Sequence, residues 1–184
     1  KQDITNGKEL PDAKLEIRAA DGNLVEGWTS GKTPHTVRGL ELEKEYTMTE
    51  TRAPDGYAEA ESIVFKLVQD GSEQSNMVYV KSDDDWVKLD DTTVVMQDAP
   101  VLDIDKTDIA GNLLPGATLT IRDENNEVVD TWTTDYKTHR IPISDDSLKL
   151  SDDSKEYIYT LTEDAAPAGF EIAESVQFKV QQAD

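Results

Sequence analysis

The feature that most constrains this 184-residue chain is an internal repeat, in which the second half restates the first. The four pairs of matching segments are 1–3 with 106–108, 10–18 with 114–122, 46–57 with 159–170, and 60–66 with 173–179. Trp28 and Trp132 also match, and His35 and His139 each follow seven residues later. Two copies at this spacing indicate two tandem structural units. We therefore predict domain 1 at residues 1–99 and domain 2 at residues 100–184.

Each copy has the side-chain pattern of β-structure. Leu15 and Ile17 alternate with polar residues, and their counterparts in domain 2 do the same. This period of two is typical of half-buried strands. The pairs at 21–22 and 125–126 predict two-residue hairpin turns, and no segment keeps the period of 3.6 residues that a helix needs. Short strands separated by turns predict an all-β fold with two tandem β-sandwich domains.

The two copies differ at three places. The offset between them grows by nine residues between His139 and Glu163, which places an insertion in domain 2, within the acidic stretch 144–154. Domain 1 has an added segment, 77–89, that predicts an extra hairpin before its last strand. Domain 2 has no counterpart of the last strand predicted at 93–98, and an unpaired sheet edge is normally protected. We expect that the parent polypeptide continues, rather than that another chain adds the strand.

The charge of the chain argues against several classes of function. It has 39 acidic and 18 basic side chains, a formal net charge of −21, and no cluster of Lys or Arg. We therefore expect no nucleic-acid partner and no direct membrane contact, because both need clustered positive charge. The apolar runs are too short to span a bilayer, and the absence of cysteine excludes disulfides.

The polar motifs predict neither a cofactor nor a metal site. The spacing of Asp103, Asp105 and Thr107 resembles the start of an EF-hand loop, but Asp108 replaces the required Gly and Leu114 the required Glu. No Gly-rich phosphate loop, metalloprotease helix or Ser-His-Asp grouping stands out, so we predict no turnover enzyme. The two histidines are expected to be structural. The tryptophans are expected to anchor the core or a sheet face, with carbohydrate stacking as the minor alternative.

Three motifs resemble the Cna B-type or SpaA-like (prealbumin-like) domains of Gram-positive surface adhesins and pilins. They are the Lys-x-Asp start, the Leu-Pro-x-Ala step, and the Thr-Glu-x-x-Ala-Pro-x-Gly box that ends in Tyr57 in domain 1 and Phe170 in domain 2. The resemblance covers nearly the whole chain, twice, and implies a transthyretin-like or inverse-immunoglobulin topology. It also implies an extracellular, cell-wall-anchored protein with its anchor outside this sequence. Its partners would be the neighbouring domains of a longer surface protein.

Many members of this family form a spontaneous isopeptide bond between a first-strand Lys and a last-strand Asn or Asp, assisted by a Glu. By this resemblance, domain 1 would join Lys1 to Asp98, with Glu50 as the assisting acid. In domain 2, Lys106 and Glu163 match the Lys and the Glu, but no acceptor is evident. In some relatives the reactive Lys lies a few residues upstream of the Lys-x-Asp motif, which in domain 1 is a place before this sequence.

The chemistry of such a bond follows from burial. A Lys amine is nucleophilic only when it is neutral, and an apolar core disfavours the charged forms of both Lys and Glu. A neutral Glu can donate a hydrogen bond to the attacked carbonyl and then carry protons to the leaving group. Fixed geometry raises the effective concentration of the reacting groups. The bond forms once, so the reaction is autocatalysis without turnover.

Two functions follow as hypotheses. The first is a structural stalk or pilin-type segment, in which a cross-link between the first and last strands carries tension and spares the hydrogen bonds of the sandwich. The alternative is an adhesive module that binds a host protein or glycan through its loops. The candidate loops are the insertion within 144–154 and the hairpin at 77–89. The fold alone does not choose between these functions, because function depends on sites placed on a fold.

Overall fold

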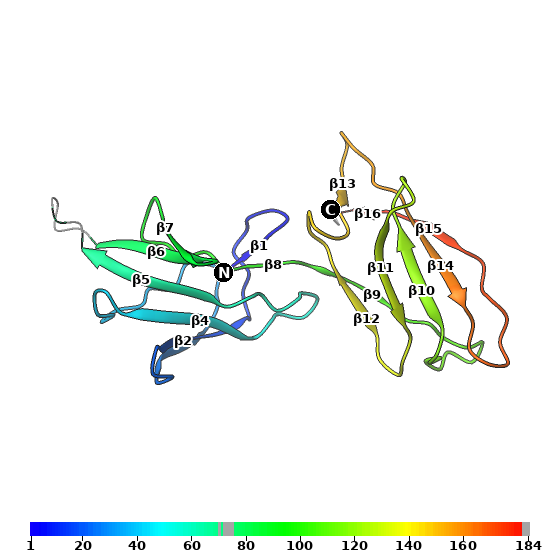
Figure 1. The fold of residues 1–184 in the computed structure, drawn as a ribbon, viewed down its shortest axis with the longest axis horizontal. Helices are drawn as coiled ribbons and strands as arrows, with labels where there is room; N and C mark the ends of the chain where they lie inside the picture. Colours follow the sequence, from blue (N-terminus) through cyan, green and yellow to red (C-terminus); the bar gives the residue numbers. More distant parts are fainter. Residues whose placement is uncertain (70, 72–75, 182–184) are drawn as a thin grey trace. The chain divides into compact units, whose positions relative to one another are not determined.

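The chain forms two compact units of β-structure. The structure is a computed structural model that describes residues 1–69, 71 and 76–181. It divides into Lys1–Ala99, here domain 1, and Pro100–Asp184, here domain 2. All the regular elements in the described residues are strands (Figure 1), which confirms the predicted all-β, two-domain fold class. None of the described residues forms a helix that could cross a membrane.

Domain 1 is built on one antiparallel sheet of six strands, in the order β3-β2-β4-β5-β6-β7. A separate parallel pair, β1 with β8, joins the beginning of the domain to its end. The strands are β1 (Gln2–Asp3), β2 (Lys14–Ala19), β3 (Leu24–Thr29), β4 (Glu45–Arg52), β5 (Ile63–Gln69), β6 (Asn76–Ser82), β7 (Asp85–Lys88) and β8 (Gln97–Asp98). Within the segment 77–89, β6 and β7 form an antiparallel hairpin at the edge of the sheet.

Domain 2 repeats four strands of that sheet, those matching β3, β2, β4 and β5, and has two smaller strand pairs. Its four-stranded sheet has the order β11-β10-β14-β15, while β9 pairs antiparallel with β12 and β13 pairs parallel with β16. The strands are β9 (Val101–Ile104), β10 (Thr118–Arg122), β11 (Val128–Thr133), β12 (His139–Pro142), β13 (Leu150–Ser151), β14 (Tyr159–Ala165), β15 (Val176–Phe178) and β16 (Val180–Gln181).

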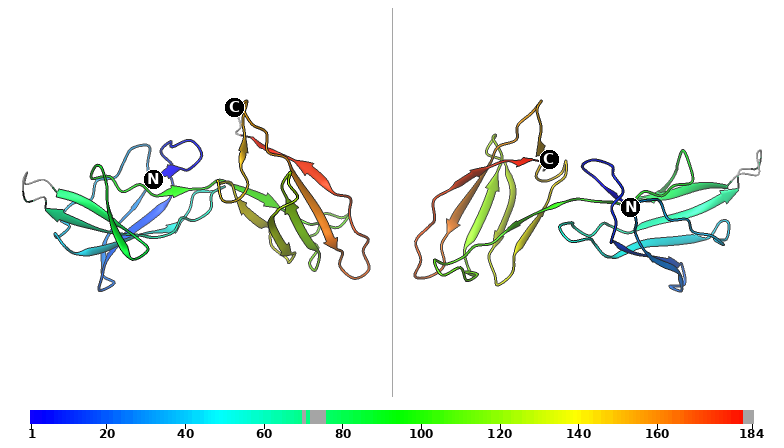
Figure 2. Two further views of the ribbon diagram at one scale, coloured as in Figure 1. Left: turned by 45° about the horizontal axis from the view of Figure 1, so that its top comes forward. Right: turned by 180° about the vertical axis from the view of Figure 1, so that it is seen from behind.

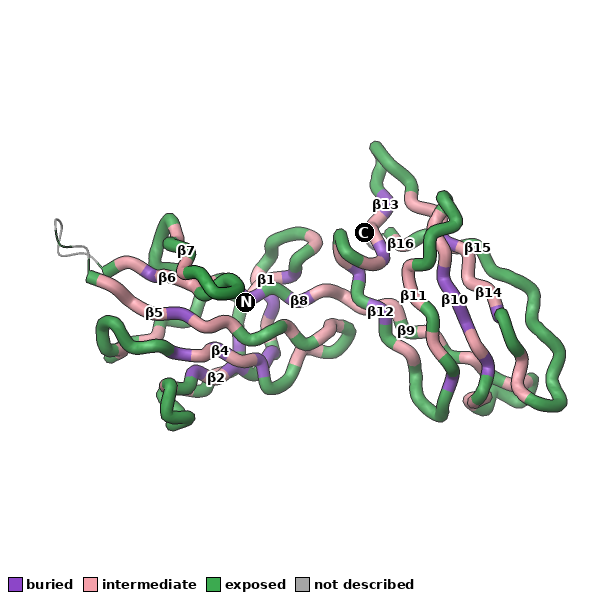
Figure 3. Tube along the Cα trace, viewed as in Figure 1, coloured by how far each residue is buried: buried purple, intermediate pink, exposed green. Residues whose placement is uncertain are grey.

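The core of each domain follows from the alternation along its central strands. In β2, Leu15 and Ile17 are buried, and polar neighbours separate them. In β10, Leu119 and Ile121 occupy the same places (Figure 3). The buried core cluster of domain 1 contains Ala13, Leu15, Ile17, Tyr46, Met48, Phe65, Val78 and Met96. That of domain 2 contains Ile121, Ile141, Ile143, Leu148 and Tyr159.

Two local predictions need correction. The two predicted hairpin turns are longer than two residues: 20–23 separate β2 from β3, and 123–127 separate β10 from β11. A register shift accompanies each longer loop, between Ile17 and Arg18 and between Ile121 and Arg122. The last strand of domain 1 is also shorter than the predicted 93–98, because only Gln97–Asp98 pairs with another strand. Val94 packs against the core without belonging to a strand. At this position the β-branched residue is explained by its packing against the core and not by membership of a strand.

The insertion in domain 2 contributes to the core as well as to the surface. Asp145, Asp146, Asp152 and Asp153 are exposed, as expected for solvated acidic runs. Leu148 between them is fully buried, with an exposed fraction of 0%. Strand β13 lies in the same stretch and pairs with β16. We refer to the strand pairs β9–β12 and β13–β16 as the second layer of domain 2. The insertion is thus an integral part of this layer, because it contains β13.

Candidate functional site

Glu50 faces the core because it continues the inward alternation of β4. Tyr46 and Met48 are the preceding inward residues of that strand, and all three side chains are buried. A register shift in the β2–β4 pair places Glu50 opposite Leu15. Its Oε2 atom accepts a hydrogen bond of 2.8 Å from the backbone N–H of Ala60. A backbone donor thus holds one oxygen of the carboxyl group and leaves the other facing the interior.

The parallel pairing of β1 with β8 brings Lys1 to Asp98 (Figures 1 and 2). The backbone N–H of Gln2 donates to the carbonyl of Met96 at 3.0 Å, and that of Ile4 donates to the carbonyl of Asp98 at 2.9 Å. The Lys1 Nζ atom donates to Asp98 Oδ1. These contacts join the first residues of domain 1 to its last residues.

Glu50 completes a cluster with these two side chains. Its Oε1 atom lies 3.2 Å from Lys1 Nζ. The exposed fractions are 2% for the Lys1 side chain and 0% for Glu50 and Asp98. The structure therefore brings together all three residues predicted for domain 1. Removing three ionisable groups from water is costly unless they pair or become neutral.

The electrostatics of the cluster shift the titration of Asp98 toward its neutral form. Burial raises the pKa of Asp98 to about 6, the Lys1 ammonium opposes that rise, and the neighbouring Glu50 carboxyl adds to it. Two buried oxygens, Glu50 Oε1 and Asp98 Oδ2, have no hydrogen-bond partner among the described residues. A neutral carboxyl group can accept a nucleophile, whereas a carboxylate resists attack. The arrangement is thus suited to joining an amine to a carboxyl group.

Domain 2 holds two of the three groups in matching places. Lys106 Nζ lies 3.1 Å from Glu163 Oε2, and the same oxygen accepts a hydrogen bond of 2.6 Å from the backbone N–H of Ala173. The Lys106 side chain is 18% exposed, against 2% for Lys1. Within residues 100–181, Glu163 is the sole ion-pair partner of Lys106. Domain 2 thus has a Lys amine beside a buried Glu, with no second carboxyl group paired with that amine among the described residues.

Sequence reasoning did not identify two supporting interactions of this site. One is the backbone donor to each buried Glu, Ala60 or Ala173. The other is the Tyr57 hydroxyl, which donates a hydrogen bond of 2.9 Å to Oδ2 of Asp3, a residue of β1, the strand that directly follows Lys1. Burial and this bond raise the pKa of Tyr57 to about 12. The sequence contains a signal for a role of this hydroxyl, because the same motif ends in Tyr57 in domain 1 and in Phe170, which has no hydroxyl, in domain 2.

The two Trp–His matches form equivalent stacks. In domain 1, the ring centroids of Trp28 and His35 lie 4.6 Å apart, and His35 Nε2 lies 2.7 Å from Glu26 Oε1. In domain 2, the corresponding centroids are 4.0 Å apart, and His139 Nε2 lies 2.7 Å from Asp130 Oδ2. Each His ring therefore stacks on a Trp ring and contacts a carboxylate, an arrangement typical of a structural residue. No group of three or more His, Cys, Asp or Glu in the described part of the chain is placed to hold a metal ion.

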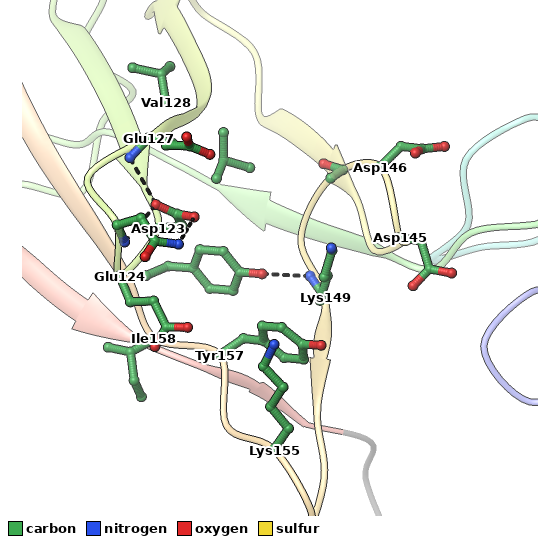
Figure 4. A pocket seen from close by; sticks show the side chains of 14 residues that line it. Asp123, Glu124, Glu127, Val128, Asp145, Asp146, Lys149, Lys155, Tyr157 and Ile158 are labelled. Atoms are coloured by element: carbon green, nitrogen blue, oxygen red, sulfur yellow. Dashed lines mark hydrogen bonds between the residues drawn. The ribbon is translucent and has the colours of Figure 1, made fainter.

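A polar pocket of about 330 Å³ lies beside the insertion of domain 2 (Figure 4). The Tyr157 ring lies at its wall, with the ammonium of Lys155 4.5 Å and that of Lys149 5.9 Å from the ring centroid. The hydroxyl of Tyr159 accepts a hydrogen bond of 2.7 Å from the backbone N–H of Lys149. The acidic side chains around the opening are Asp123, Glu124, Glu127, Asp145 and Asp146.

Comparison with known proteins identifies the class of these domains. The sequence profile of the SpaA prealbumin-like fold domain matches residues 1–82 and 101–184, so both repeats are covered. Both repeats are therefore prealbumin-like fold domains. The chain belongs to the SpaA family of prealbumin-like fold domains, as the motifs predicted.

Solved structures of larger proteins are similar to the chain. The Bacillus anthracis TIE protein is 25% identical with a TM-score of 0.33, and the alignment covers 98% of this chain and 30% of that one. The pilus-presented adhesin Spy0125 (Cpa) is 21% identical with a TM-score of 0.36, covering 85% and 39%. The pilus adhesin SpaC from Lactobacillus rhamnosus GG is 16% identical with a TM-score of 0.34, covering 98% and 26%. The chain thus spans well under half the length of these proteins, and no curated protein matches it.

Proposed function

We propose that this chain is a pair of stalk or pilin-type domains from a Gram-positive cell-surface protein, and that domain 1 is locked by an isopeptide bond between Lys1 and Asp98. One observation carries the proposal. The side chains of Lys1, Glu50 and Asp98 are buried together in domain 1, with the amine in contact with both carboxyl groups. Such a costly arrangement of ionisable groups is typical of a functional site. Membership of the SpaA family supports the same reading.

The reaction is a condensation within one domain. The neutral Lys1 amine attacks Cγ of a neutral Asp98 carboxyl, while Glu50 donates a hydrogen bond to the carbonyl oxygen under attack. A new C–N bond forms and the C–OH bond breaks. The hydroxyl leaves as water with a proton that Glu50 carries from the amine. Glu50 ends in its starting state, but the protein does not, so each chain reacts once.

The position of the bond gives it a mechanical role. Lys1 and Asp98 lie at the two ends of domain 1, at the places where tension along the chain enters and leaves it. A covalent bond between them carries that tension past the hydrogen-bonded strands between. Such a domain suits a load-bearing segment of an extracellular, wall-anchored protein whose partners are its neighbouring domains. It needs no cofactor.

The intact mass of the denatured protein tests this proposal. The parent chain is expected to be lighter than its sequence by one water, whereas Glu50→Ala and Asp98→Ala should retain the full mass. Fragmentation of the parent should also yield a branched peptide that joins Lys1 to Asp98, which shows the bond directly. Glu163→Ala is the matched control, and it should still lose one water, because domain 2 has no described acceptor. A parent chain of full mass would refute the cross-link.

The alternative function is adhesion, and the pocket beside the insertion is the observation that favours it. The pocket combines an aromatic ring, two amines and several carboxyl groups, which are the groups that bind a polar ligand such as a glycan. Titration of the protein with a glycan array, against a variant with Tyr157→Ala, tests this function. Saturable binding that depends on Tyr157 would establish an adhesive role.

A further inference from the structure

One short segment of domain 1, residues 57–60, forms hydrogen bonds with every part of the proposed cross-linking site. Its partners are the first strand, the residue that follows the last strand, and the assisting acid. The three hydrogen bonds join Tyr57 Oη to Asp3 Oδ2 at 2.9 Å, Ala58 N to Ala99 O at 2.9 Å, and Ala60 N to Glu50 Oε2 at 2.8 Å. The segment therefore lies where it can set the relative places of the reacting groups.

The hydrogen bond from Tyr57 is the one that reaches the first strand. The Asp3 carboxyl is buried, and it also accepts hydrogen bonds from the backbone N–H and hydroxyl of Thr5 and from the amide of Asn6, which belong to its own turn. Among the described residues, Tyr57 is its sole partner from a distant part of the chain. The hydroxyl thus ties β1 to the segment 57–60.

Holding Asp3 also constrains Lys1. Side chains two positions apart on an extended strand point to the same side. Lys1 directly precedes β1, and its side chain is buried like that of Asp3. The amine therefore moves with β1, and any freedom of β1 would shift the amine relative to Asp98.

The Tyr57 hydroxyl is suited to a permanent role as a donor. Burial raises the pKa of Tyr57 to about 12, and the hydrogen bond to Asp3 and the charges of Asp3 and Asp98 add to the rise. The hydroxyl therefore keeps its proton across the neutral range. The contribution of Asp98 shows that Tyr57 lies near the acceptor as well as near β1.

Domain 2 shows that the fold forms without this tie. The backbone N–H of Ala173 donates to Glu163 as in domain 1. Phe170, however, replaces the tyrosine and is 50% exposed. Asp108 stands in the place of Asp3, and in the described part of domain 2 the hydrogen-bond donors to its carboxyl all come from its own turn. The tie is thus a feature of domain 1 that the prealbumin-like sheet does not require.

We propose that Tyr57 is a positioning residue for the cross-linking reaction. Its hydroxyl holds Asp3 and so fixes the short strand that directly follows Lys1. Ala58 holds the residue after β8 from the same segment, so one segment sets the places of both the amine and the Asp98 carboxyl group. A misplacement of about 1 Å can slow a reaction roughly 100-fold. The inference rests on the proposed isopeptide bond and adds the residue that aligns it.

The rate at which new chains lose one water tests this role. A pulse of isotope-labelled amino acid during cell-free synthesis marks these chains, and their mass is followed after tryptophan fluorescence shows that folding is complete. Loss of stability alone leaves the rate in folded chains unchanged. Tyr57→Phe is expected to slow the loss of water about tenfold or more, with complete cross-linking at long times.

Tyr46→Phe is the matched control. The Tyr46 hydroxyl accepts a hydrogen bond of 2.9 Å from the backbone N–H of Glu41, away from the three residues of the site. This variant should lose water at the parent rate. Asp3→Ala tests the route, because Tyr57→Phe should cause no further slowing once its partner is removed.

Three outcomes would overturn the inference while the isopeptide bond stands. They are a parent rate in Tyr57→Phe, equal slowing in Tyr46→Phe, and additive slowing by Tyr57→Phe and Asp3→Ala. A parent chain that keeps its full mass would instead refute the bond itself, and the inference with it. The failure of the proposed function is therefore distinguishable from the failure of the role of Tyr57.

Discussion

Glu50 and Glu163 occupy matching places in the two copies of the fold but have different surroundings. Each carboxyl group receives a backbone hydrogen bond, from Ala60 or Ala173, and each lies near a lysine amine. Among the described residues, Glu50 alone also has a second carboxyl group in its cluster, that of Asp98. In the proposed reaction this third group is essential, because a Lys amine and a Glu without an acceptor have no carbon to join.

At the residue scale, we predict that Glu50→Gln abolishes the cross-link while it preserves the fold. The amide oxygen of Gln can still accept the hydrogen bond from Ala60, but Gln cannot transfer protons between the amine and the leaving group. The measurement is the fraction of chains that lack one water after refolding, compared with Glu163→Gln. Cross-linking at the parent rate in Glu50→Gln would show that Glu50 is not the proton carrier.

A second residue-scale prediction concerns pH. In Lys1→Met the cross-link cannot form, and the amine that opposes the raised pKa of Asp98 is gone, so the pKa of Asp98 lies above about 6. The unfolded carboxyl has a pKa near 3.9, so the folded state holds its proton more tightly. The free energy of unfolding should therefore fall as pH rises from about 4 through about 6 and beyond.

Urea denaturation across this pH range measures the effect. The control is Lys1→Met combined with Asp98→Asn, in which the titrating group of Asp98 is removed. The free energy of unfolding should fall less steeply with rising pH in the double variant than in Lys1→Met, because the double variant lacks the Asp98 carboxyl group. Equal slopes in the two variants would show that Asp98 is not the group responsible.

At the scale of elements, the register of the central strands sets the site. The β2–β4 pair shifts register between Lys14 and Leu15, and the β10–β14 pair shifts between Thr118 and Leu119. The same irregularity in both domains places the Glu of the box opposite the first buried Leu. Local bulges of this kind often aim a side chain at a functional site.

The insertion of domain 2 supports a prediction at the same scale. Leu148 is fully buried in the core although acidic residues surround it in the sequence. We predict that Leu148→Ala destabilises domain 2 by about 2–5 kcal/mol, because it leaves a cavity in a packed core. Calorimetry should show a lower transition for domain 2 and an unchanged one for domain 1. The exposed neighbour Asp146→Ala is the control, with an expected change within about 0.5 kcal/mol.

At the scale of the whole molecule, the two domains differ in how they are expected to bear force. In domain 1 the proposed bond joins Lys1 to Asp98 and encloses almost the whole domain. In domain 2 the described residues contain no such closure, and its short pairs β9–β12 and β13–β16 carry the second layer. One chain would thus combine a domain of fixed length with an extensible one.

Single-molecule force spectroscopy on the chain, pulled by its two ends, measures this difference. The parent should release the contour length of domain 2 alone, because the cross-link keeps domain 1 from extending. In Asp98→Ala both domains should extend, with two separate unfolding events. Full extension of domain 1 in the parent would contradict the stalk function, even if a cross-link exists elsewhere in the chain.

Local sequence pattern is sufficient to predict several features of this protein. The repeat predicts two domains, and the alternation of Leu15 and Ile17 with polar residues predicts strands. These properties need only neighbouring residues, because a strand has a period of two. The motif resemblance then supplied Lys1 and Asp98 as candidates, without showing that they meet.

The remaining features depend on contacts between segments that are distant in the sequence. Lys1 and Asp98 are 97 positions apart, and only the parallel pairing of β1 with β8 brings them into contact. Leu148 gave no periodic signal, because a single apolar residue in an acidic run is buried only through contacts with distant strands. Each of these features depends on pairing between remote segments, which no local pattern encodes.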